Sequence, residues 1–333
     1  MDPHADQQNK LQHGLSIVIL HWNRPWSLEI AVESLNRMRG RCVFPIEIIL
    51  ADDGSDAALH PFFDKLPLDQ IYLHPQHIYE KDRASVYHTL QAAYENSRFD
   101  HLMYVEDDFW FIPQGFRDHG KSHLEGLLAS PAIKDDSNPI QGGVDLLLST
   151  PEARFVELAR GYLNPRYPSD PITEQIHSGI HFRSKLHPAD STWYSCAWPH
   201  IQRTSEALRI LLPQGKTLWQ GERELSRARQ QAYGQGNWVF DAGKCYFVHM
   251  NIFTWREVLK QEDQADINGS LRWMELEDGQ QLPYDFKAIP GFNLRLLDAF
   301  LKGKLQNDLG AYYTSTPFEY AYQWLYRKVL DDL

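Results

Sequence analysis

Short runs of apolar residues alternate with amphipathic segments along the first third of the chain. Residues 15–20 (LSIVIL) and 46–51 (IEIILA) are rich in β-branched side chains, a pattern typical of strands that are buried on both faces. The segment between them predicts a helix, because apolar residues recur there at helical spacing and Ser27 can cap its first turn. The apolar positions of this helix are Leu28, Ala31, Val32 and Leu35.

The same alternation continues for a second round. Residues 70–74 predict a third strand, residues 84–96 a helix and residues 101–105 a fourth strand. Strand, helix and strand at this spacing form a right-handed parallel unit. We therefore predict an α/β fold with a Rossmann-like, mostly parallel sheet flanked by helices. In open sheets of this kind, ligands bind beyond the carboxyl ends of the strands.

The remainder of the chain gives a weaker pattern. It predicts helices over residues 115–129, 151–162 and 201–211, and a strand over residues 244–248 that ends at His249. Residues 167–199 are rich in Pro, Ser, His and aromatic residues, and we interpret them as long loops over a binding surface. Two C-terminal helices are predicted over 294–305 and 317–330. Their aromatic residues favour packing on the core or joining subunits of a homo-oligomer over resting on a membrane.

Composition and charge exclude several classes of function. The formal net charge of −11, with acidic residues spread along the chain, argues against a nucleic-acid partner. Three scattered cysteines indicate neither a disulfide framework nor a zinc site, and they favour a reducing, cytoplasmic compartment. No apolar run is long enough for a transmembrane helix, so we expect no transmembrane segment.

Acidic residues cluster at two of the predicted strand ends. Asp52 and Asp53 follow the second strand, and Glu106, Asp107 and Asp108 follow the fourth. Three adjacent carboxylates are costly to bury together unless a cation neutralises them. Oxygen ligands of this kind suit Mg2+ or Mn2+, which would also bridge to phosphate groups. The alternative interpretation is an acidic loop that merely caps the next helix.

Three segments, in this order, resemble the opening of the family 2 glycosyltransferases, which have the GT-A fold. The segments are residues 15–24 (LSIVILHWNR), 51–55 (ADDGS) and 105–108 (VEDD). The resemblance covers roughly the first third of the chain. It implies inverting transfer of a sugar from a nucleotide diphosphate donor, with Mn2+ or Mg2+ as cofactor. In this family the commonest nucleotide of the donor is UDP.

The resemblance also assigns the donor side of the site. Asp53 matches the carboxylate that contacts the base or ribose of the donor nucleotide. Glu106 and Asp108 match the first and last positions of the D-x-D motif, with Asp108 as the metal ligand. The leading Glu departs from the strict motif but keeps a carboxylate. The other donor-binding candidates are His21, Asn23, Arg24, Arg83 and Asp107, and an ordinary surface charge is the alternative for Arg83.

The segment WQGERELSR, residues 219–227, resembles the helix start that carries the catalytic base of the family. Glu222 matches the base position, and Glu224 is the rival candidate. A helix dipole stabilises a carboxylate at this end as an anion, which suits a base. Gly221 stands where the family commonly has a second acid. The alternative is that both glutamates belong to a solvated helical face.

Further candidates lie in the second half of the chain. His249 resembles the His that completes the metal shell or touches the donor phosphates in many GT-A enzymes, although a single His is more often structural. The aromatic residues Trp193, Tyr194 and Trp198 offer ring faces suited to an acceptor sugar, whereas burial is the commoner outcome for such residues. Gly142 and Gly143 permit close approach of the backbone to a ligand, and a plain turn explains them equally well.

The sequence thus predicts an inverting glycosyltransferase that modifies a hydroxyl acceptor, most simply a glycan. Its expected parts are a polar leader (1–13), a nucleotide-sugar-binding half (14–115), an acceptor-binding and catalytic half (116–255) and a largely helical C-terminal extension (256–333). Two alternatives stay open. A nucleotidyltransferase would share the acidic metal site but needs a Gly-rich phosphate loop, and residues 20–24 have no glycine. A catalytically inactive relative would bind a glycan or scaffold a partner.

Overall fold

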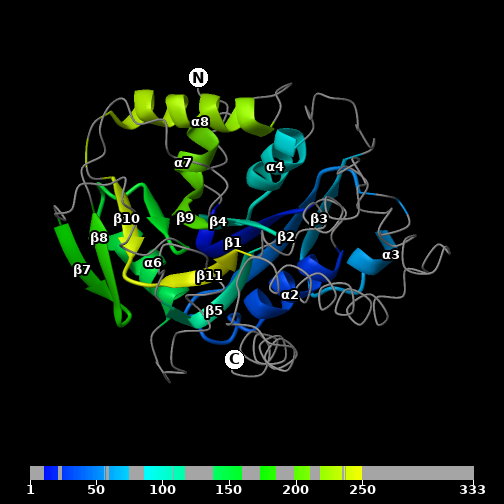
Figure 1. Ribbon diagram of the computed structural model, residues 1–333, viewed down its shortest axis with the longest axis horizontal. Coiled ribbons are helices and arrows are strands. Elements are labelled where there is room, and N and C mark those ends of the chain that lie inside the picture. Colours follow the sequence, from blue (N-terminus) through cyan, green and yellow to red (C-terminus); the bar gives the residue numbers. More distant parts are fainter. Residues whose placement is uncertain are drawn as a thin grey trace, which may run out of the picture.

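A computed structural model of the 333-residue chain gives the fold (Figure 1). The structure describes residues 11–21, 25–55, 57, 60–74, 86–107, 109–116, 138–159, 173–184, 199–210, 218–234, 236 and 238–249. The predicted C-terminal helices and the boundaries of the C-terminal extension lie outside these residues. Within the described residues, no helix is both long enough and apolar enough to cross a membrane.

Four parallel strands form the N-terminal part of a nine-stranded sheet. They are β1 (Gln12–His21), β2 (Ile46–Asp52), β3 (Gln70–Leu73) and β4 (Phe99–Glu106), in the order β3-β2-β1-β4. All four predicted strands are therefore present. Strands β1, β2 and β4 extend one to three residues beyond their predicted ends, and β3 ends one residue earlier than predicted. The continuous apolar runs reflect burial, since every described residue from Leu15 to Leu20 is buried.

Five shorter strands extend the sheet beyond β4. They are β9 (His200–Arg203), β6 (Phe155–Glu157), β10 (Val239–Ala242), β8 (Ile180–Ser184) and β7 (Thr173–His177), in that order. Within this sheet, β9 is antiparallel to β4 and β6, and β8 is antiparallel to β10 and β7, whereas β10 is parallel to β6. Only β8 and β9 of the described strands in this sheet therefore run against the common direction, which confirms the predicted mostly parallel α/β architecture.

Helices cover both faces of the sheet (Figure 1). On one face, α2 (Pro25–Asn36), α3 (His60–Phe63) and α6 (Pro139–Ser149) share a core with Ile17, Ile19 and Leu50. On the other, α4 (Val86–Glu95), α7 (Thr204–Arg209) and α8 (Leu218–Tyr233) share a core with Val18 and Leu20. Alternate residues of one strand thus enter opposite cores.

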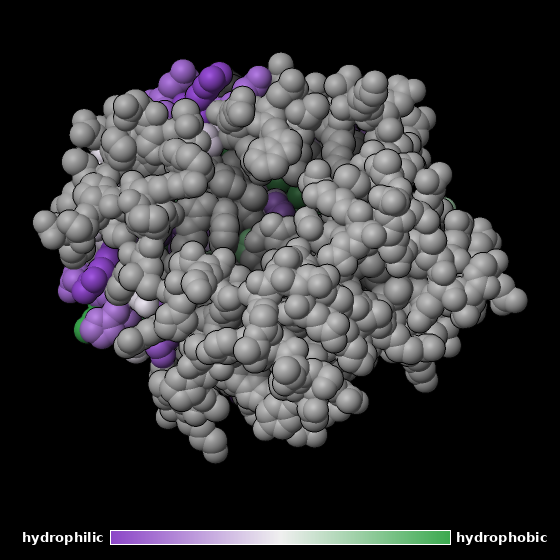
Figure 2. All heavy atoms as spheres, viewed as in Figure 1, coloured by the Kyte–Doolittle hydropathy of each residue, from purple (hydrophilic) through white to green (hydrophobic). Residues whose placement is uncertain are grey.

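The outer side of α8 is hydrophilic, as Figure 2 shows along the upper edge of the molecule, where α8 lies. Its inner side buries Leu225, Ser226 and Arg229, and the guanidinium carbon of Arg229 lies 4.3 Å from the ring centre of Phe155 in β6. A helix start was expected in this segment only from the resemblance of residues 219–227 to the family, and α8 runs from Leu218 to Tyr233. A separate two-stranded sheet joins β5 (Phe109–Phe116) to β11 (Cys245–His249), and β11 agrees with the strand predicted there.

Several predictions for the second half are wrong. The helix predicted over 151–162 contains β6 instead. Of the helix predicted over 115–129, the first two residues belong to β5 and the rest lies outside the described residues. The helix predicted from residue 201 begins only at Thr204, because residues 200–203 form β9. The presumed loops at 167–199 contain the hairpin of β7 and β8. These strands are three to five residues long, too short for their periodicity to distinguish strand from helix.

Two smaller expectations are also corrected. Ser27 lies inside α2, which begins at Pro25, so it does not cap that helix. Gly142 and Gly143 lie in α6 rather than in a turn or at a ligand. A Cβ atom on Gly142 would lie 2.6 Å from the carbonyl oxygen of His177, and one on Gly143 would lie 2.8 Å from Cδ1 of Ile201. These glycines let α6 pack closely on the sheet.

Gly142→Ala is therefore expected to destabilise the protein by about 1 to 3 kcal/mol, because the new methyl group meets backbone rather than a movable side chain. Urea unfolding followed by circular dichroism measures the change. Gly40→Ala is the matched control, since a Cβ atom at Gly40 has no heavy atom within 4 Å. Equal midpoints for the two variants would contradict this account of α6 packing.

Candidate active site

The carboxyl ends of β1, β2 and β4 meet where the strand order reverses. From β1 the chain proceeds to β2 and β3 on one side and then returns to β4 on the other. In register, His21 of β1 lies opposite Asp52 of β2, and Leu20 lies opposite Glu106 of β4. A reversal of this kind opens a crevice beyond the strand ends, which is where doubly wound sheets bind ligands.

A buried hydrogen bond joins two of these strand ends. Nδ1 of His21 lies 2.6 Å from Oδ2 of Asp107, and both side chains are fully buried. The ring of Phe63 in α3 packs edge-on against the His21 ring, at 5.3 Å between centroids. The backbone N–H of Asp107 also donates to the carbonyl oxygen of Leu20. The position of Asp107 is thus fixed by β1 through its backbone and through its side chain.

His21 was predicted to contact the donor, and its place in the structure points to a different role. The residue is 1% exposed, and its ring contacts the equally buried carboxylate of Asp107. Among the described residues, its Nε2 atom has no hydrogen-bond partner. A histidine at the end of one strand and a carboxylate at the end of its neighbour is a signal that could have predicted the pair. The missing information was the register of β1 with β4.

Asp52 shapes the loop at the end of β2. Its carboxylate accepts hydrogen bonds from the backbone N–H of Ser55, at 2.8 Å, and from the Ser55 hydroxyl. Gly54 in this loop has a φ of +77°, a conformation that glycine adopts without strain. The adjacent Asp53 is half-buried, and its backbone N–H donates to the carbonyl oxygen of His21. Asp53, the predicted nucleotide contact, therefore stands at the tip of β2 beside β1.

The acidic cluster after β4 is divided between the two faces of the sheet. Glu106 shares a face with Tyr104, whose hydroxyl donates to it at 3.0 Å. Burial, followed by the negative charge of Glu106, raises the pKa of Tyr104 well above its ordinary value. Asp107 instead turns to His21. Two of the three carboxylates thus form hydrogen bonds within the protein, and the third, Asp108, lies outside the described residues.

Strand pairing brings the predicted His249 to this cluster from the far end of the described chain. His249 is the last residue of β11 and pairs with Phe109, the first residue of β5. Phe109 follows Asp108 directly, and its ring is buried in the core. The backbone of His249 thus lies beside Phe109, the residue that follows Asp108 in the sequence. Carboxylate and imidazole are both ligand types that divalent cations accept.

Helix α8 carries both candidate bases. Glu222 lies in its second turn, and Glu224 is half-buried one residue beyond Arg223. Gly221 packs against Tyr87 of α4, and a Cβ atom at this position would collide with the Tyr87 ring. This contact gives a physical reason for glycine where the resembled family has a second acid. It also sets the start of α8 against the start of α4.

The remaining predicted site residues lie outside the described residues. They are Asn23, Arg24, Arg83, Asp108, Trp193, Tyr194 and Trp198. Of Glu222 and His249, the backbone is described and the side chain is not. The structure thus brings together the strand-end positions that hold His21, Asp53, Glu106, Asp107 and His249.

Comparison with known proteins gives no match to any family model and none to curated protein sequences. Among solved structures, S. aureus TarS 1-349 aligns over 95% of this chain and 88% of its own, with 15% identity and a TM-score of 0.37. Glucosyl-3-phosphoglycerate synthase from Mycobacterium tuberculosis, solved with Mn2+, UDP-glucose and phosphoglyceric acid, aligns over 87% and 79%, with 10% identity and a TM-score of 0.41.

The catalytic domain of Drosophila β1,4-galactosyltransferase 7, solved with xylobiose, aligns over 72% of this chain and 71% of its own, with 10% identity and a TM-score of 0.35. Two of these three proteins transfer sugars according to their names, and that is the class of enzyme the sequence resembles. The low identities and TM-scores carry no functional argument, so the assignment rests on the residues of this chain.

His21→Phe tests the buried pair. The variant keeps a ring against Phe63 but removes the nitrogen that contacts Asp107. We expect the free energy of unfolding to fall by roughly 2 to 3 kcal/mol, the usual loss for a hydrogen bond to a charged group. Urea unfolding measures it, with His88→Phe at an exposed position of α4 as control. A loss no larger than that of the control would show that the pair does not hold β1 to β4.

Glu29 of α2 gives a pH-dependent prediction. Burial, and then the negative charge of Glu33 one turn later, raise its pKa from 4.5 to about 7. The folded state favours the protonated form, so its contribution to stability is full below pH 4.5 and is lost as the pH rises through 7. Glu29→Gln should therefore raise the melting temperature relative to the wild type by a few degrees at pH 8 and not at pH 4. Glu152→Gln at an exposed turn controls for the lost charge.

Proposed function

We propose that this protein is an inverting, metal-dependent glycosyltransferase that moves a sugar from a nucleotide diphosphate donor, in the first place a UDP-sugar, to a hydroxyl of a glycan acceptor. One observation carries the proposal. The tips of β1, β2 and β4, which carry Asp53, Glu106 and Asp107, are neighbours at the reversal of strand order, where doubly wound sheets bind ligands. The backbone of His249 is brought beside the same cluster.

The donor nucleotide is expected to lie over the ends of β1 and β2. Asp53 is half-buried there, so part of its carboxylate can accept hydrogen bonds from a ribose or base. The buried Asp52 holds the loop through Ser55, and the His21 carbonyl holds the Asp53 backbone. This network fixes the carboxylate before the donor binds, which lowers the entropy cost of binding. Arg83, Asn23 and Arg24 remain the proposed basic and polar contacts of the donor.

Asp108 and His249 are the proposed ligands of Mn2+ or Mg2+. When bound, such an ion neutralises negative charge on the departing diphosphate. The role is given to Asp108 because it matches the metal-binding last position of the D-x-D motif that the segment resembles. Its neighbours Glu106 and Asp107 form hydrogen bonds with Tyr104 and His21. The pairing of His249 with Phe109 supports His249 as the second ligand.

Glu222 is the proposed base, with Glu224 as the alternative. It takes the proton of the acceptor hydroxyl as the oxygen attacks the anomeric carbon of the donor from the face opposite the diphosphate. The bond to the diphosphate breaks as the new glycosidic bond forms, so the configuration inverts. The start of α8 is anchored on α4 through Gly221 and Tyr87, which fixes where this base stands relative to the sheet. Trp193, Tyr194 and Trp198 are proposed to contact the acceptor.

The two competing functions differ from this proposal in testable ways. A nucleotidyltransferase would need a Gly-rich phosphate loop after β1, and residues 20–24 have none. An inactive relative was suggested by the missing acid at Gly221. The packing of Gly221 on Tyr87 supplies a structural reason for that glycine, which weakens the argument for lost activity.

A thermal-shift screen of nucleoside diphosphates, each with and without Mn2+, tests the donor site. We expect one nucleotide to raise the melting temperature by a few degrees only when Mn2+ is present. Asp108→Ala should abolish this coupled shift. Asp64→Asn, an exposed carboxylate after α3, should retain it. A shift that is independent of the metal in all variants would remove the proposed metal role of Asp108.

Glu222→Gln separates binding from catalysis. The variant should keep the donor-induced thermal shift of the wild type, because the substitution preserves shape and leaves the strand-end carboxylates in place. Nucleotide-sugar turnover, measured as release of the nucleoside diphosphate, should fall by roughly 100-fold or more through loss of the base. Full turnover in this variant together with loss in Glu224→Gln would move the base to Glu224. Absence of turnover in the wild type would favour the inactive, glycan-binding alternative.

A further inference from the structure

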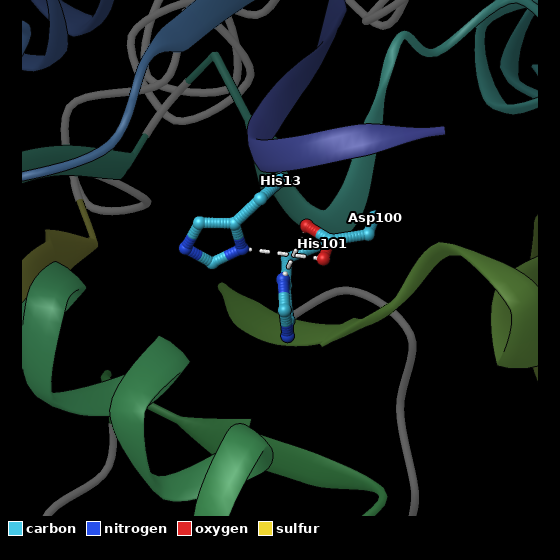
Figure 3. Close-up of side chains that lie close together, drawn as sticks. All are labelled: His13, Asp100 and His101. Atoms are coloured by element: carbon cyan, nitrogen blue, oxygen red, sulfur yellow. Dashed lines mark hydrogen bonds and ion pairs between the residues drawn. The ribbon is translucent and has the colours of Figure 1, made fainter. Parts of the chain in front are cut away.

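Three metal-ligating side chains converge at the amino ends of β1 and β4, at the opposite end of these strands from the candidate active site. They are His13 near the start of β1 and Asp100 and His101 near the start of β4 (Figure 3). One ligand atom from each side chain lies within 4.8 Å of the ligand atoms of the other two. None of these three residues takes part in the proposed sugar transfer.

A β-bulge brings the three side chains together. Gln12 pairs with Phe99 and Leu15 pairs with His101, so His13 and Gly14 together face the single residue Asp100. Successive side chains of a regular strand point to opposite faces, and a bulge changes the direction of the residues at it. In Figure 3, the carboxylate of Asp100 contacts both imidazole rings, His13 through Oδ2 and His101 through Oδ1.

Gly14 makes this bulge possible. A Cβ atom at Gly14 would lie 2.6 Å from Cδ1 of Phe99 and 2.8 Å from the carbonyl oxygen of Pro45. The backbone N–H of Gly14 donates to Oδ1 of Asp100 at 3.0 Å, which fixes the carboxylate against β1. The position of Asp100 is therefore determined by the backbone and does not depend on the two histidines alone.

The distances within the cluster match those between ligands of one metal ion. Nδ1 of His13 lies 3.2 Å from Oδ2 of Asp100, and Nδ1 of His101 lies 2.8 Å from Oδ1. Two ligands bound tetrahedrally to one zinc ion at about 2.0 to 2.1 Å stand roughly 3.3 Å apart. The three ligand atoms, which lie within 4.8 Å of one another, draw closer when they share one ion.

Charge and exposure also suit an ion. An aspartate carboxylate is ordinarily an anion at neutral pH, as a ligand must be. The His101 side chain is 3% exposed and that of His13 is 50% exposed. One ligand is anchored in the core, and the other faces solvent, from which an ion and a water ligand can enter.

We propose that His13, Asp100 and His101 bind a divalent transition metal ion, Zn2+ in the first place, at the amino ends of β1 and β4. Two imidazoles and one carboxylate favour Zn2+ and similar ions over Mg2+ or Mn2+, which prefer oxygen ligands. The bound ion links the start of β1 to the start of β4 and stabilises the pairing of the two strands at their amino ends. The site is separate from the proposed catalytic metal at Asp108 and His249.

Equilibrium dialysis of the full-length protein against Zn2+, after removal of metals with a chelator, tests the site. The wild type should bind one equivalent of Zn2+ that His13→Gln does not bind. Gln can still donate a hydrogen bond to Asp100, so this variant keeps the fold while losing the ligand. His88→Gln, an exposed histidine on α4, should bind as the wild type does. Asp108→Ala should also keep this equivalent, which distinguishes it from the catalytic metal.

Two further measurements make the outcome decisive. Co2+ should give the visible absorption of a tetrahedral site in the wild type and not in His13→Gln. Zn2+ should raise the melting temperature of the wild type by a few degrees relative to that variant. Equal Zn2+ binding by the wild type and His13→Gln, or no saturable binding by either, would overturn the proposal and leave the cluster as a hydrogen-bonded network.

Discussion

The hydrogen bond between His21 and Asp107 is the constraint on which the candidate active site depends. It joins the carboxyl ends of β1 and β4 inside the protein, where water cannot take the place of either partner. Backbone bonds extend the connection, from Asp107 to Leu20 and from Asp53 to His21. These bonds join the ends of β1, β2 and β4 and fix the backbone at Asp53 and Asp107.

Burial of the sheet on both faces explains how the acidic cluster is divided. Alternate residues of β4 enter opposite cores, so Glu106 faces the side of Tyr104 and Asp107 faces the side of His21. The pleat separates neighbouring carboxylates that would repel each other strongly if they shared one face. Each of the two then meets a hydrogen-bonding partner. Glu106 and Asp107, adjacent in one charged run of the sequence, thus have different surroundings.

The paired strands β1 and β4 carry polar clusters at both ends. At the carboxyl ends, the register sets His21 near Asp107, and at the amino ends the bulge sets His13 near Asp100 and His101. The apolar middle of both strands is fully buried and keeps the two clusters apart. The same strand pair can therefore support two independent sites, because each end is fixed by its own backbone hydrogen bonds.

The sequence by itself determined the first four strands, their helices and the edge of the sheet at which the acidic residues gather. Strands buried on both faces need continuous apolar runs, and such runs can be recognised without knowledge of their neighbours. Strand β11 was predicted from its own apolar run, whereas a helix start at α8 was expected only from the resemblance of residues 219–227 to the family. The strands β6, β8 and β9 were not predicted, because segments this short are stabilised by the neighbours with which they pair rather than by their own pattern.

Only the tertiary structure decided which polar residues meet. The sequence placed His21 among the donor contacts, and the register of β1 with β4 turned it toward Asp107 instead. It gave no reason for Gly221, which the ring of Tyr87 explains, and it gave no sign that His13 reaches Asp100. Local patterns record whether a residue is buried, whereas its partner depends on strand order, register and bulges. Those are properties of the whole sheet, set by contacts between segments that are distant in the sequence.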